Sequence, residues 1–304
     1  MRISVIIVAY QGDKWLPKCI ESINASSHHR IELLLVDNYD SPCLAGLKTP
    51  GLTRRIVKTP RVMGFAEANN FALTNGGCDS DAVLLLNQDT WSESQWIPQC
   101  ADILESDQSV NAVSPIIKQY DNDQLDPNFE TSVADAGFMP QGATPVTVEH
   151  VPAVALMIRT ETLKAVGPLD PIFGSYYEDY DLCLRLNRHE GRIVIATDAS
   201  VRHFSGSAST TDASRRKRSV QIIRNRLIYK LRKEGGPRWM RLLGHFGRDL
   251  PRNLLRGLLR TQSSQPISVT IEGNLEILKL LRRISSKKQD ELGWRQYLDQ
   301  IAWH

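Results

Sequence analysis

Short apolar runs alternate with helical segments along the first 117 residues of the chain. The apolar runs carry Val, Ile and Leu with little polar alternation, which is typical of strands buried on both faces of a sheet. A β-α-β-α order of this kind requires a sheet with right-handed crossovers. The sequence therefore predicts an α/β fold with a parallel sheet flanked by helices. The strands are predicted at residues 3–9, 31–36, 54–58, 82–86 and 111–117, and the helices at 14–22, 65–74 and 95–105.

Polar side chains follow three of these strands directly. Ala9-Tyr10 ends the first strand, Asp37-Asn38 ends the second, and Asn87-Gln88-Asp89 follows the run at 82–86. In open parallel sheets, ligands bind outside the carboxyl ends of the strands. We therefore expect these residues to line one binding site.

A second acidic cluster lies in Gly174-Ser-Tyr-Tyr-Glu-Asp-Tyr-Asp181. An uncompensated charge near a core costs free energy, so clustered carboxylates indicate work on a cation or a proton. One acidic centre could hold a metal-bound phosphate, and the other could take a proton from a nucleophile. Two such centres on an α/β framework predict a transferase that uses a phosphate-linked donor.

The pattern changes twice along the rest of the chain. Periodicity fails over 118–150, which predicts an irregular insertion lying over one side of the site. Past Ser205 only helical patterns remain, so we expect a sheet domain over 1–210 and a helical extension over 211–304. Between these two regions the sequence predicts a buried run at 151–159, helices from Glu161 and over 181–189, and short strands at 192–196 and 199–203.

Five scattered cysteines, with no Cys-x-x-Cys pair, argue against a disulfide framework or a zinc site and favour a reducing compartment. They are expected as small core residues. The N-terminal apolar run is short and lacks a small-residue cleavage site, and no run approaches the length of a membrane span. The expected localisation is cytoplasmic, with peripheral association on the inner face of the cytoplasmic membrane.

Charge is distributed unevenly. Residues 215–260 carry 15 Lys and Arg against two acids, whereas the whole chain has a net charge of +3. Arg248, Arg252, Arg256 and Arg260 recur every four residues, and leucines lie to the other side. Residues 237–260 are therefore expected to meet an anionic membrane surface. The alternatives are an amphipathic helix packed on the sheet domain and a homodimer contact, whereas the few aromatic residues argue against nucleic acid.

An ordered series of motifs carries a family resemblance over about residues 1–230. The chain resembles inverting glycosyltransferases of family 2, which have the GT-A fold, and is most similar to their bacterial rhamnosyltransferase-like branch. The resemblance implies an α/β, Rossmann-like fold with a mixed, mostly parallel sheet flanked by helices, followed by the C-terminal helical extension. The matching pieces are Ser4-Val-Ile-Ile-Val-Ala-Tyr10, Leu35-Val-Asp-Asn38, Gly64-Phe-Ala-Glu-Ala-Asn-Asn70, Leu85-Leu-Asn-Gln-Asp-Thr90, Val154-Ala-Leu-Met-Ile-Arg159, Gly167-Pro-Leu-Asp170, Tyr177-Glu-Asp-Tyr-Asp-Leu182 and His203-Phe-Ser-Gly206.

The resemblance implies a role for each site residue. Asp179 matches the catalytic base, and Glu178 and Asp181 would shape the acceptor side. Asp89 and His203 match the positions that hold Mg²⁺ or Mn²⁺ against the two phosphates of the donor. The expected donor-binding residues are Ala9, Tyr10, Asp37, Asn38, Gly64, Asn69, Asn87 and Asp89.

The same resemblance implies the substrates. The expected donor is a sugar, rhamnose first, linked to dTDP or UDP, and the acceptor is a saccharide or lipid-linked saccharide of a cell-surface polysaccharide. The alternatives are a hexose or N-acetylhexosamine donor with the same chemistry, and a catalytically silent nucleotide-sugar-binding scaffold subunit. A nucleic-acid-binding protein is a third alternative, and it would require salt-sensitive binding through the basic segment.

Several residues depart from the family pattern or have ordinary structural interpretations. The metal motif is reduced to Asn87-Gln88-Asp89, which leaves one carboxylate, and Gln11, Val62 and Ala68 replace the usual residues of the donor loops. Asp89 could instead cap a helix, and the acids at 178–181 could be the acidic first turn of one. His203, Asp37 and Gly64 could likewise be structural residues.

Overall fold

The computed structural model describes residues 1–24, 30–38, 40–49, 51–75, 79–93, 95–134, 144–205, 211–233, 238–259 and 267–280. They form two compact units. The first unit is built mainly from Met1–Gly174 and Glu178–Gly206, and the second from Ser175–Tyr177 and Ser207–Lys288. The boundary expected at 210/211 stays a prediction.

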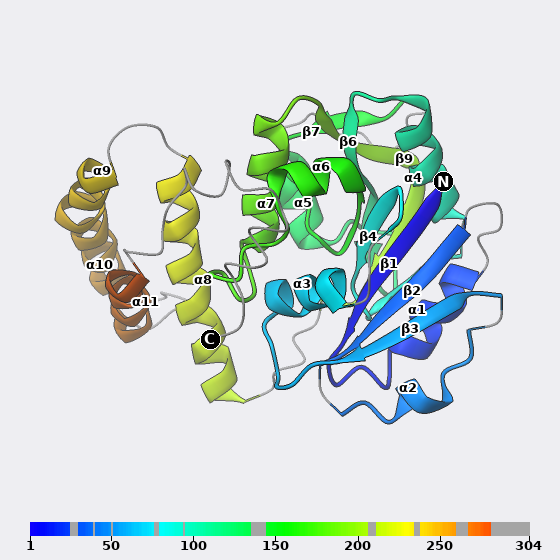
Figure 1. The fold of residues 1–304 in the computed structure, drawn as a ribbon. Helices are drawn as coiled ribbons and strands as arrows, with labels where there is room; N and C mark the ends of the chain where they lie inside the picture. Colours follow the sequence, from blue (N-terminus) through cyan, green and yellow to red (C-terminus); the bar gives the residue numbers. More distant parts are fainter. Residues whose placement is uncertain are drawn as a thin grey trace. The chain divides into compact units, whose positions relative to one another are not determined.

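A mixed sheet forms the centre of the first unit (Figure 1). Its strand order is β3-β2-β1-β4-β8-β6-β9-β5, and β7 pairs with β9. The β3-β2-β1-β4 half is parallel, whereas β8 runs antiparallel to both β4 and β6. The strands are β1 (Arg2–Ala9), β2 (Arg30–Asp37), β3 (Thr53–Lys58), β4 (Ala82–Leu86), β5 (Thr90–Trp91), β6 (Val110–Gln119), β7 (Val146–Val148), β8 (Ala155–Arg159) and β9 (Arg192–His203).

Helices lie on both faces of this sheet, as the β-α-β rhythm predicts (Figure 1). Helix α3 packs against β1 and β2, α4 packs against β6 and β9, and α7 contacts β9. The helices of the first unit are α1 (Leu16–Asn24), α2 (Cys43–Gly46), α3 (Phe65–Asn75), α4 (Trp96–Ser106), α5 (Pro127–Val133), α6 (Thr160–Val166) and α7 (Glu178–Arg188).

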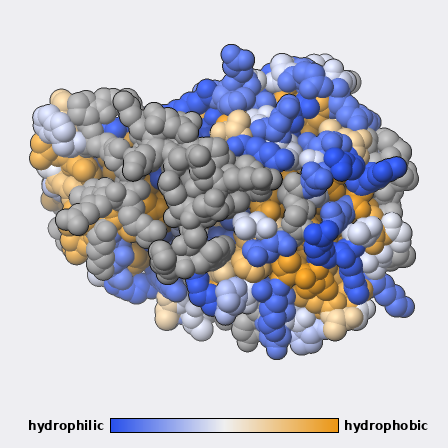
Figure 2. All heavy atoms as spheres, in the orientation of Figure 1, coloured by the Kyte–Doolittle hydropathy of each residue, from blue (hydrophilic) through white to orange (hydrophobic). Residues whose placement is uncertain are grey.

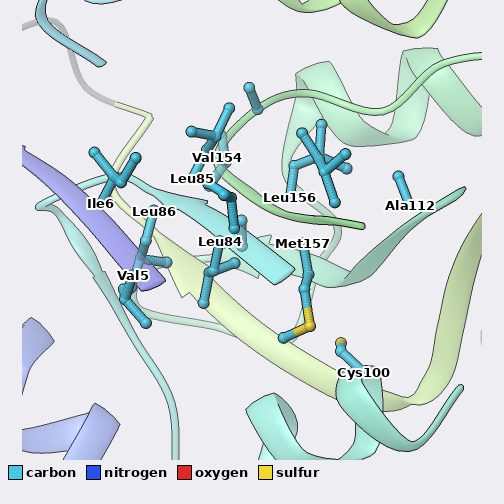
Figure 3. Close-up of a cluster of buried hydrophobic side chains, with 14 of the residues drawn as sticks. Val5, Ile6, Leu84, Leu85, Leu86, Cys100, Ala112, Val154, Leu156 and Met157 are labelled. Atoms are coloured by element: carbon cyan, nitrogen blue, oxygen red, sulfur yellow. The ribbon is translucent and has the colours of Figure 1, made fainter. Parts of the chain in front are cut away.

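The centre of the core lies where β1, β4 and β8 meet α4 (Figure 3). All five residues of β4 are buried, and Leu156 and Met157 of β8 are fully buried beside them. Cys100 of α4 completes this cluster as a small apolar residue. Cys19 and Cys183 are also buried, as predicted, whereas Cys43 is half-buried and Cys78 lies outside the described residues. This packing of β4 fixes the position at which the following loop, 87–89, begins.

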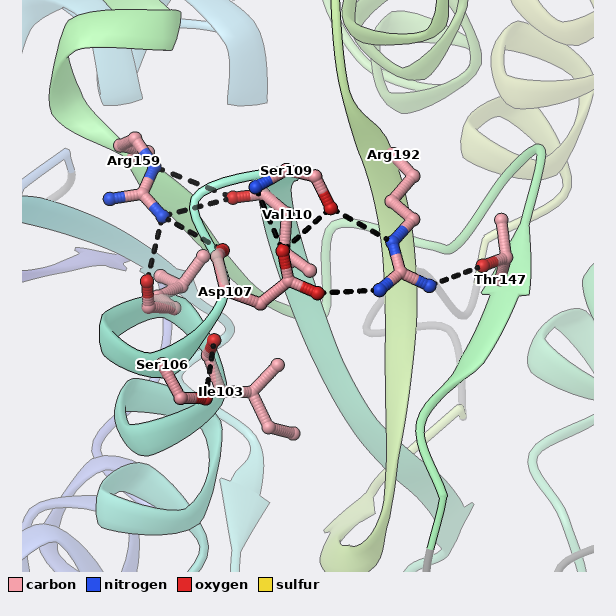
Figure 4. Close-up of polar contacts among 9 residues, drawn as sticks. Ile103, Ser106, Asp107, Ser109, Val110, Thr147, Arg159 and Arg192 are labelled. Carbon is pink, nitrogen blue, oxygen red and sulfur yellow. Dashed lines mark hydrogen bonds and ion pairs between the residues drawn. The ribbon is translucent and has the colours of Figure 1, made fainter.

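A polar network ties the sheet together at the edge where β6 and β9 begin (Figure 4). The Arg192 guanidinium donates to Asp107 Oδ2 (2.6 Å) and to Thr147 Oγ1 (3.2 Å). Hydrogen bonds from Ser109 and from this guanidinium lower the pKa of Asp107 to about 2. Arg159, paired in register with Ala82 at the start of β4, donates to the Leu104 carbonyl (2.7 Å). This network therefore lies at the edge opposite the Asn87–Asp89 loop.

Three local predictions differ from the structure. The irregular insertion contains α5 and β7, although residues 135–143 lie outside the described part. The two strands expected at 192–196 and 199–203 are one strand, β9, whose pairing with β6 shifts register between Ala196 and Ser200. That bulge explains the break in the apolar pattern. Helix α7 begins at Glu178 rather than near Asp181, which places Asp179 in its first turn.

The second unit is helical in the part that the structure describes. Helix α8 (Asp212–Lys233) packs against α11 (Ile267–Leu280), and α9 (Arg238–Gly244) leads through a π-helical turn, His245–Asp249, into α10 (Leu250–Leu259). Pro251 lies just after the π-helical turn within this continuous helical stretch, where its missing N–H interrupts the helical hydrogen-bond ladder. The predicted run of helices is therefore present over the described residues.

The second unit also includes the segment Ser175–Tyr177. Asn225 of α8 is fully buried, and its Nδ2 donates to the carbonyls of Ser175 (2.9 Å) and Tyr176 (2.7 Å). Tyr176 and Tyr177 have positive φ angles of 69° and 72°, a backbone region that L-residues rarely adopt. The hydrogen bonds from Asn225 hold this unusual backbone just before α7.

Candidate functional site

The ends of β1, β2 and β4 meet at one edge of the sheet. Ala9 and Asp37 are register partners, and the Asn38 N–H donates to the Ala9 carbonyl (3.0 Å). The Tyr10 N–H donates to Gln88 Oε1 (3.0 Å), and Gln88 Nε2 donates back to the Tyr10 carbonyl (2.7 Å). A Cβ at Gly12 would collide with this same amide. The residues at the ends of β1, β2 and β4, which were predicted to line one site, therefore lie next to one another.

Asp37 and Asn38 differ in what their side chains can do. The amide of Asn38 is buried and bonded on both sides, since Nδ2 donates to the Met63 carbonyl (2.9 Å) and Oδ1 accepts from the Met63 N–H (2.8 Å). Asp37 Oδ1 is buried without a hydrogen-bond partner among the described residues. Asp37 Oδ2 lies 4.0 Å from the Lys58 ammonium. Asn38 therefore holds the loop at 59–63, whereas Asp37 keeps an acceptor for a ligand.

The start of α3 approaches the loop that precedes α7. A Cβ on Gly64 would lie 2.8 Å from the Gly174 carbonyl oxygen, which also accepts the Ala66 N–H (2.9 Å). Asn69 is buried, and its Nδ2 donates to the Phe65 carbonyl (2.9 Å). Gly64 is therefore required for close backbone packing, and the Asn69 amide stabilises α3 itself.

Asp89 and His203 are brought together by β5, a strand of only two residues. Thr90 pairs with His203 in an antiparallel register, and the Phe204 N–H donates to the Asp89 carbonyl (3.1 Å). As a result, His203 Nε2 lies 3.6 Å from Asp89 Oδ1 and 3.3 Å from Asn87 Nδ2. These three residues, taken from strands far apart in the sequence, form one cluster.

Asp126 orients the His203 ring. Its Oδ2 lies 3.0 Å from His203 Nδ1 and also accepts from Ser205 Oγ, while its Oδ1 caps α5 through the Asn128 N–H (2.8 Å). Burial acts to raise the pKa of Asp126, but hydrogen bonds from His203 and Ser205 outweigh it and hold that pKa below its usual value. Because Asp126 is ionised, Nδ1 carries the ring proton. The Nε2 lone pair of neutral His203 therefore points towards Asn87 and Asp89.

The chemistry of this cluster fits a divalent cation. Burial is the main cause that raises the pKa of Asp89, and the nearby Asp126 adds to it, so an ionised Asp89 needs a counter-charge. Asn87 Oδ1 is buried without a hydrogen-bond partner in the described part of the chain. A carboxylate, an imidazole nitrogen and an amide oxygen all suit Mn²⁺ or Mg²⁺. Within the described ranges no three His, Cys, Asp or Glu side chains form a metal cluster, so the protein supplies only part of a coordination shell.

The acidic cluster at the start of α7 divides into three different environments. Asp181 is buried and accepts from Arg185 Nε (2.9 Å), and Arg185 in turn donates to the carbonyls of Val166 and Gly167. This pairing fits a structural role for Asp181 better than contact with an acceptor. Glu178 is buried, and burial together with the Asp179 charge raises its pKa well above the usual value. Asp179 is different, because its side chain remains 18% exposed.

A residue that sequence reasoning missed lies beside Asp179. His150 Nε2 is 3.7 Å from Asp179 Oδ2, and the His150 ring stacks on Tyr180 with centroids 3.5 Å apart. His150 Nδ1 lies 3.0 Å from Ser132 Oγ in α5. Position 150 falls within a segment without periodicity, and no motif marked it. Helix α5 thus contributes to both histidine environments, through Asp126 at its start and Ser132 near its end.

Comparison with known proteins identifies the family to which this chain belongs. A family model described as "Glycosyltransferase like family 2" matches residues 1–221. No curated protein matches the chain closely in sequence. Similar solved structures include S. aureus TarS 1-349 in complex with UDP-GlcNAc, at 13% identity and a TM-score of 0.62, covering 98% of this chain and 90% of that one.

Two further structures share the fold. GalNAc-T7 with UDP, GalNAc and Mn²⁺ has 13% identity and a TM-score of 0.59, and the match covers 99% of this chain and 56% of that one. The mannosyltransferase PcManGT from Pyrobaculum calidifontis, in complex with GDP-Man and Mn²⁺, has 13% identity and a TM-score of 0.57, covering 98% and 86%. The fold is therefore GT-A, as expected. The chain belongs to the family-2-like glycosyltransferases.

Proposed function

We propose that this glycosyltransferase inverts the configuration of the transferred sugar and that Asp179 is its catalytic base. The observation that carries the proposal is the separation of roles among the three acids of α7. Asp181 is paired with Arg185, and Glu178 is buried with a raised pKa, whereas the Asp179 carboxylate remains partly exposed. A base must reach a proton on a bound acceptor, and Asp179 alone of these three meets that condition.

In the proposed step, Asp179 takes the proton of an acceptor hydroxyl as its oxygen attacks the anomeric carbon. A new carbon–oxygen bond forms on one face while the bond to the donor phosphate breaks on the other. The electron pair leaves with the nucleoside diphosphate. One carboxylate at the reacting centre is sufficient for inversion, so no covalent sugar–enzyme intermediate is required.

The donor would lie along the edge formed by β1, β2 and β4. Asp37 Oδ1, which has no partner among the described residues, would accept from the base or the ribose. Ala9 and Tyr10 would border the nucleotide through their backbone, while Asn38, Gly64 and Asn69 would support the surrounding loops. Asn87 would contact the donor beside Asp89.

Asp89 and His203 would hold Mg²⁺ or Mn²⁺, which supplies positive charge against the donor diphosphate when it is bound. Support comes from the Nε2 lone pair directed at Asp89 and from the raised pKa of that carboxyl. The related folds of GalNAc-T7 and PcManGT were solved with Mn²⁺. The remaining ligands would come from the donor and from water, which is usual for Mg²⁺ with phosphate substrates.

For the substrate, we propose rhamnose on dTDP or UDP as the donor and a saccharide or lipid-linked saccharide as the acceptor. The support is the order of sequence motifs, which is most similar to the rhamnosyltransferase-like branch. Hexose and N-acetylhexosamine donors remain the alternative with the same chemistry. The related folds hold UDP-GlcNAc in TarS and GDP-Man in PcManGT.

We further propose a cytoplasmic enzyme that associates peripherally with an anionic membrane surface through residues 237–260. Among the described helices, none is long and apolar enough to cross a bilayer. On the second unit, Trp239 and Leu243 of α9 are 63% and 65% exposed, and Figure 2 shows hydrophobic side chains gathered over α9 and α10. Exposed Trp and Leu beside arginines are typical of interfacial helices. Arg256 and Arg260 of the predicted basic face lie outside the described side chains.

The first test is a thermal-shift screen of dTDP-rhamnose, UDP-glucose, UDP-GlcNAc and GDP-mannose, each with and without MnCl₂. A ligand that binds only the folded state raises the melting temperature by mass action, so no acceptor is needed. We expect a Mn²⁺-dependent shift with one donor, and loss of that dependence in Asp89→Ala. A donor that binds equally well without metal, or a metal-dependent shift that survives in Asp89→Ala, would contradict the proposed metal site.

A further inference from the structure

The His150 side chain has a defined proton arrangement. Ser132 Oγ donates its only hydrogen to the Asn128 carbonyl (2.8 Å), one turn earlier in α5. Ser132 Oγ must therefore accept from His150 Nδ1, which lies 3.0 Å away. In the neutral ring, Nδ1 then carries the hydrogen and Nε2 carries a lone pair.

That lone pair faces a second acceptor. His150 Nε2 is buried and has no hydrogen-bond partner among the described residues, and Asp179 Oδ2 lies 3.7 Å away from it. The ring cannot swing away easily, because it stacks on Tyr180 with an interplanar angle of 12°. Two acceptors are thus held face to face without a hydrogen between them. Such an arrangement is unfavourable until one of the two gains a proton.

We propose that His150 is a positioning and proton-accepting partner of Asp179, an inference that rests on the proposed role of Asp179 as the base. When Asp179 takes the acceptor proton, its carboxyl becomes a donor and can close on His150 Nε2. The proton can then pass to Nε2, which leaves an imidazolium with hydrogens on both nitrogens and restores the Asp179 carboxylate. Release of that proton to solvent resets the pair.

This role explains why a buried histidine is aimed at the base with its acceptor nitrogen. The new hydrogen bond exists only after proton transfer begins, so it would stabilise the transition state rather than the bound substrates. His150 should therefore affect kcat and leave donor affinity unchanged. Its removal should lower kcat by about 10- to 100-fold, the effect expected for one charge-assisted hydrogen bond.

The first experiment measures the ring directly and needs no substrate. In ¹⁵N-histidine-labelled full-length protein, long-range ¹H–¹⁵N spectra distinguish the two neutral tautomers, and His150→Phe assigns the signal. We expect a protonated Nδ1 and an unprotonated Nε2 for neutral His150, with Nε2 changing its shift in Asp179→Asn. A hydrogen on Nε2 of the neutral ring would overturn the proposal, because that nitrogen would then be a donor to Asp179.

The second experiment tests the catalytic consequence. Nucleoside diphosphate release from dTDP-rhamnose or UDP-GlcNAc, with water as acceptor, is compared in His150→Phe and His150→Ala. His150→Phe keeps a ring on Tyr180 and lacks the nitrogen, so both variants should lose kcat while their Mn²⁺-dependent donor thermal shift persists. Added imidazole should restore His150→Ala, whereas pyrrole, a ring of similar size without a basic nitrogen, should not.

Full kcat in His150→Phe, or equal rescue by imidazole and pyrrole, would overturn the role of His150. Failure of the base assignment has a different signature, since Asp179→Asn would then remain active. Loss of activity in Asp179→Asn together with full activity in His150→Phe would leave the proposed function intact and remove only this inference.

Discussion

Two histidines of the first unit face carboxylates in the same way and are supported differently. His203 Nε2 lies 3.6 Å from Asp89, and His150 Nε2 lies 3.7 Å from Asp179. Behind His203 is the buried carboxylate of Asp126, whereas behind His150 is the neutral hydroxyl of Ser132. A carboxylate behind the ring increases the basicity of the facing nitrogen and suits a metal ligand. A hydroxyl fixes the tautomer without adding charge, which suits a group that gains and loses a proton.

Helix α5 is what makes the two sites comparable. It has seven residues, from Pro127 to Val133, so Asp126 and Ser132 are separated by about 9 Å along the helix axis at a rise of 1.5 Å per residue. One short helix therefore sets the tautomer of both rings and fixes the spacing between the proposed metal site and the proposed base. A displacement of α5 would disturb both sites together.

The largest expected effect is that of Asp179→Asn, which should lower turnover without weakening donor binding. Asp179→Asn should lower transfer by roughly 10²- to 10⁴-fold, the usual contribution of a positioned general base. Its Mn²⁺-dependent donor thermal shift should match that of the wild type, because Asp179 lies in the other histidine pair. Comparing turnover with thermal shift in the same preparations checks this. An Asp179→Asn protein with normal turnover would refute the base assignment.

A smaller effect is expected from the residues behind the rings. Asp126→Asn should weaken Mn²⁺-dependent UDP binding by about 10- to 100-fold, as for other residues that support metal-binding histidines. Asparagine still caps a helix, so α5 should persist. Ser132→Ala is the matched control at the other ring and should leave this binding unchanged. Calorimetric titration of UDP with and without MnCl₂ measures both, and equal weakening in the two variants would show that only helix α5, not the carboxylate, matters.

The smallest expected effect concerns stability. The folded-state pKa of Glu178 is raised, chiefly by burial, while in the unfolded chain it returns to about 4.3. As the pH rises above that value, Glu178 ionises in the unfolded chain but stays protonated in the folded protein. Ionisation therefore stabilises the unfolded state, and the free energy of unfolding of the wild type falls. Glu178→Gln removes this loss and should raise the melting temperature at pH 7.

The same variant should show no gain near pH 4, where the unfolded glutamate is itself largely protonated. Thermal melts at pH 4 and pH 7 decide the matter. A lower melting temperature for Glu178→Gln at pH 7 would mean that the ionised Glu178 has a compensating partner.

The sheet was predictable because its strands are uninterrupted apolar runs, as in β4, where all five residues are buried. The grouping of Tyr10, Asp37 and Asn87 also followed from the rule that parallel strands end at a common edge. In contrast, periodicity gave no sign that Asp89 and His203 lie together, because β5, which pairs them, has only two residues. Only the family resemblance put these two residues in one site.

The support of both histidines was hidden for a similar reason. Helix α5 is too short for a periodic pattern, although Asp126 followed by Pro127 is a recognisable helix start. Nothing in the sequence singled out His150, because its partner Asp179 is brought near only by the packing of α7. Tertiary placement, rather than local preference, determined the residues that sequence reasoning missed.

The amide of Gln88, bonded in both directions to the Tyr10 backbone, has a consequence for how this enzyme could diverge. Position 88 lies between Asn87, a proposed donor contact, and Asp89, a proposed metal ligand, and its side chain fills the space that a Cβ at Gly12 would need. A substitution at either position therefore changes what is permitted at the other. Across homologous sequences the two should vary as a pair, with a side chain at position 12 appearing only where position 88 carries a shorter residue.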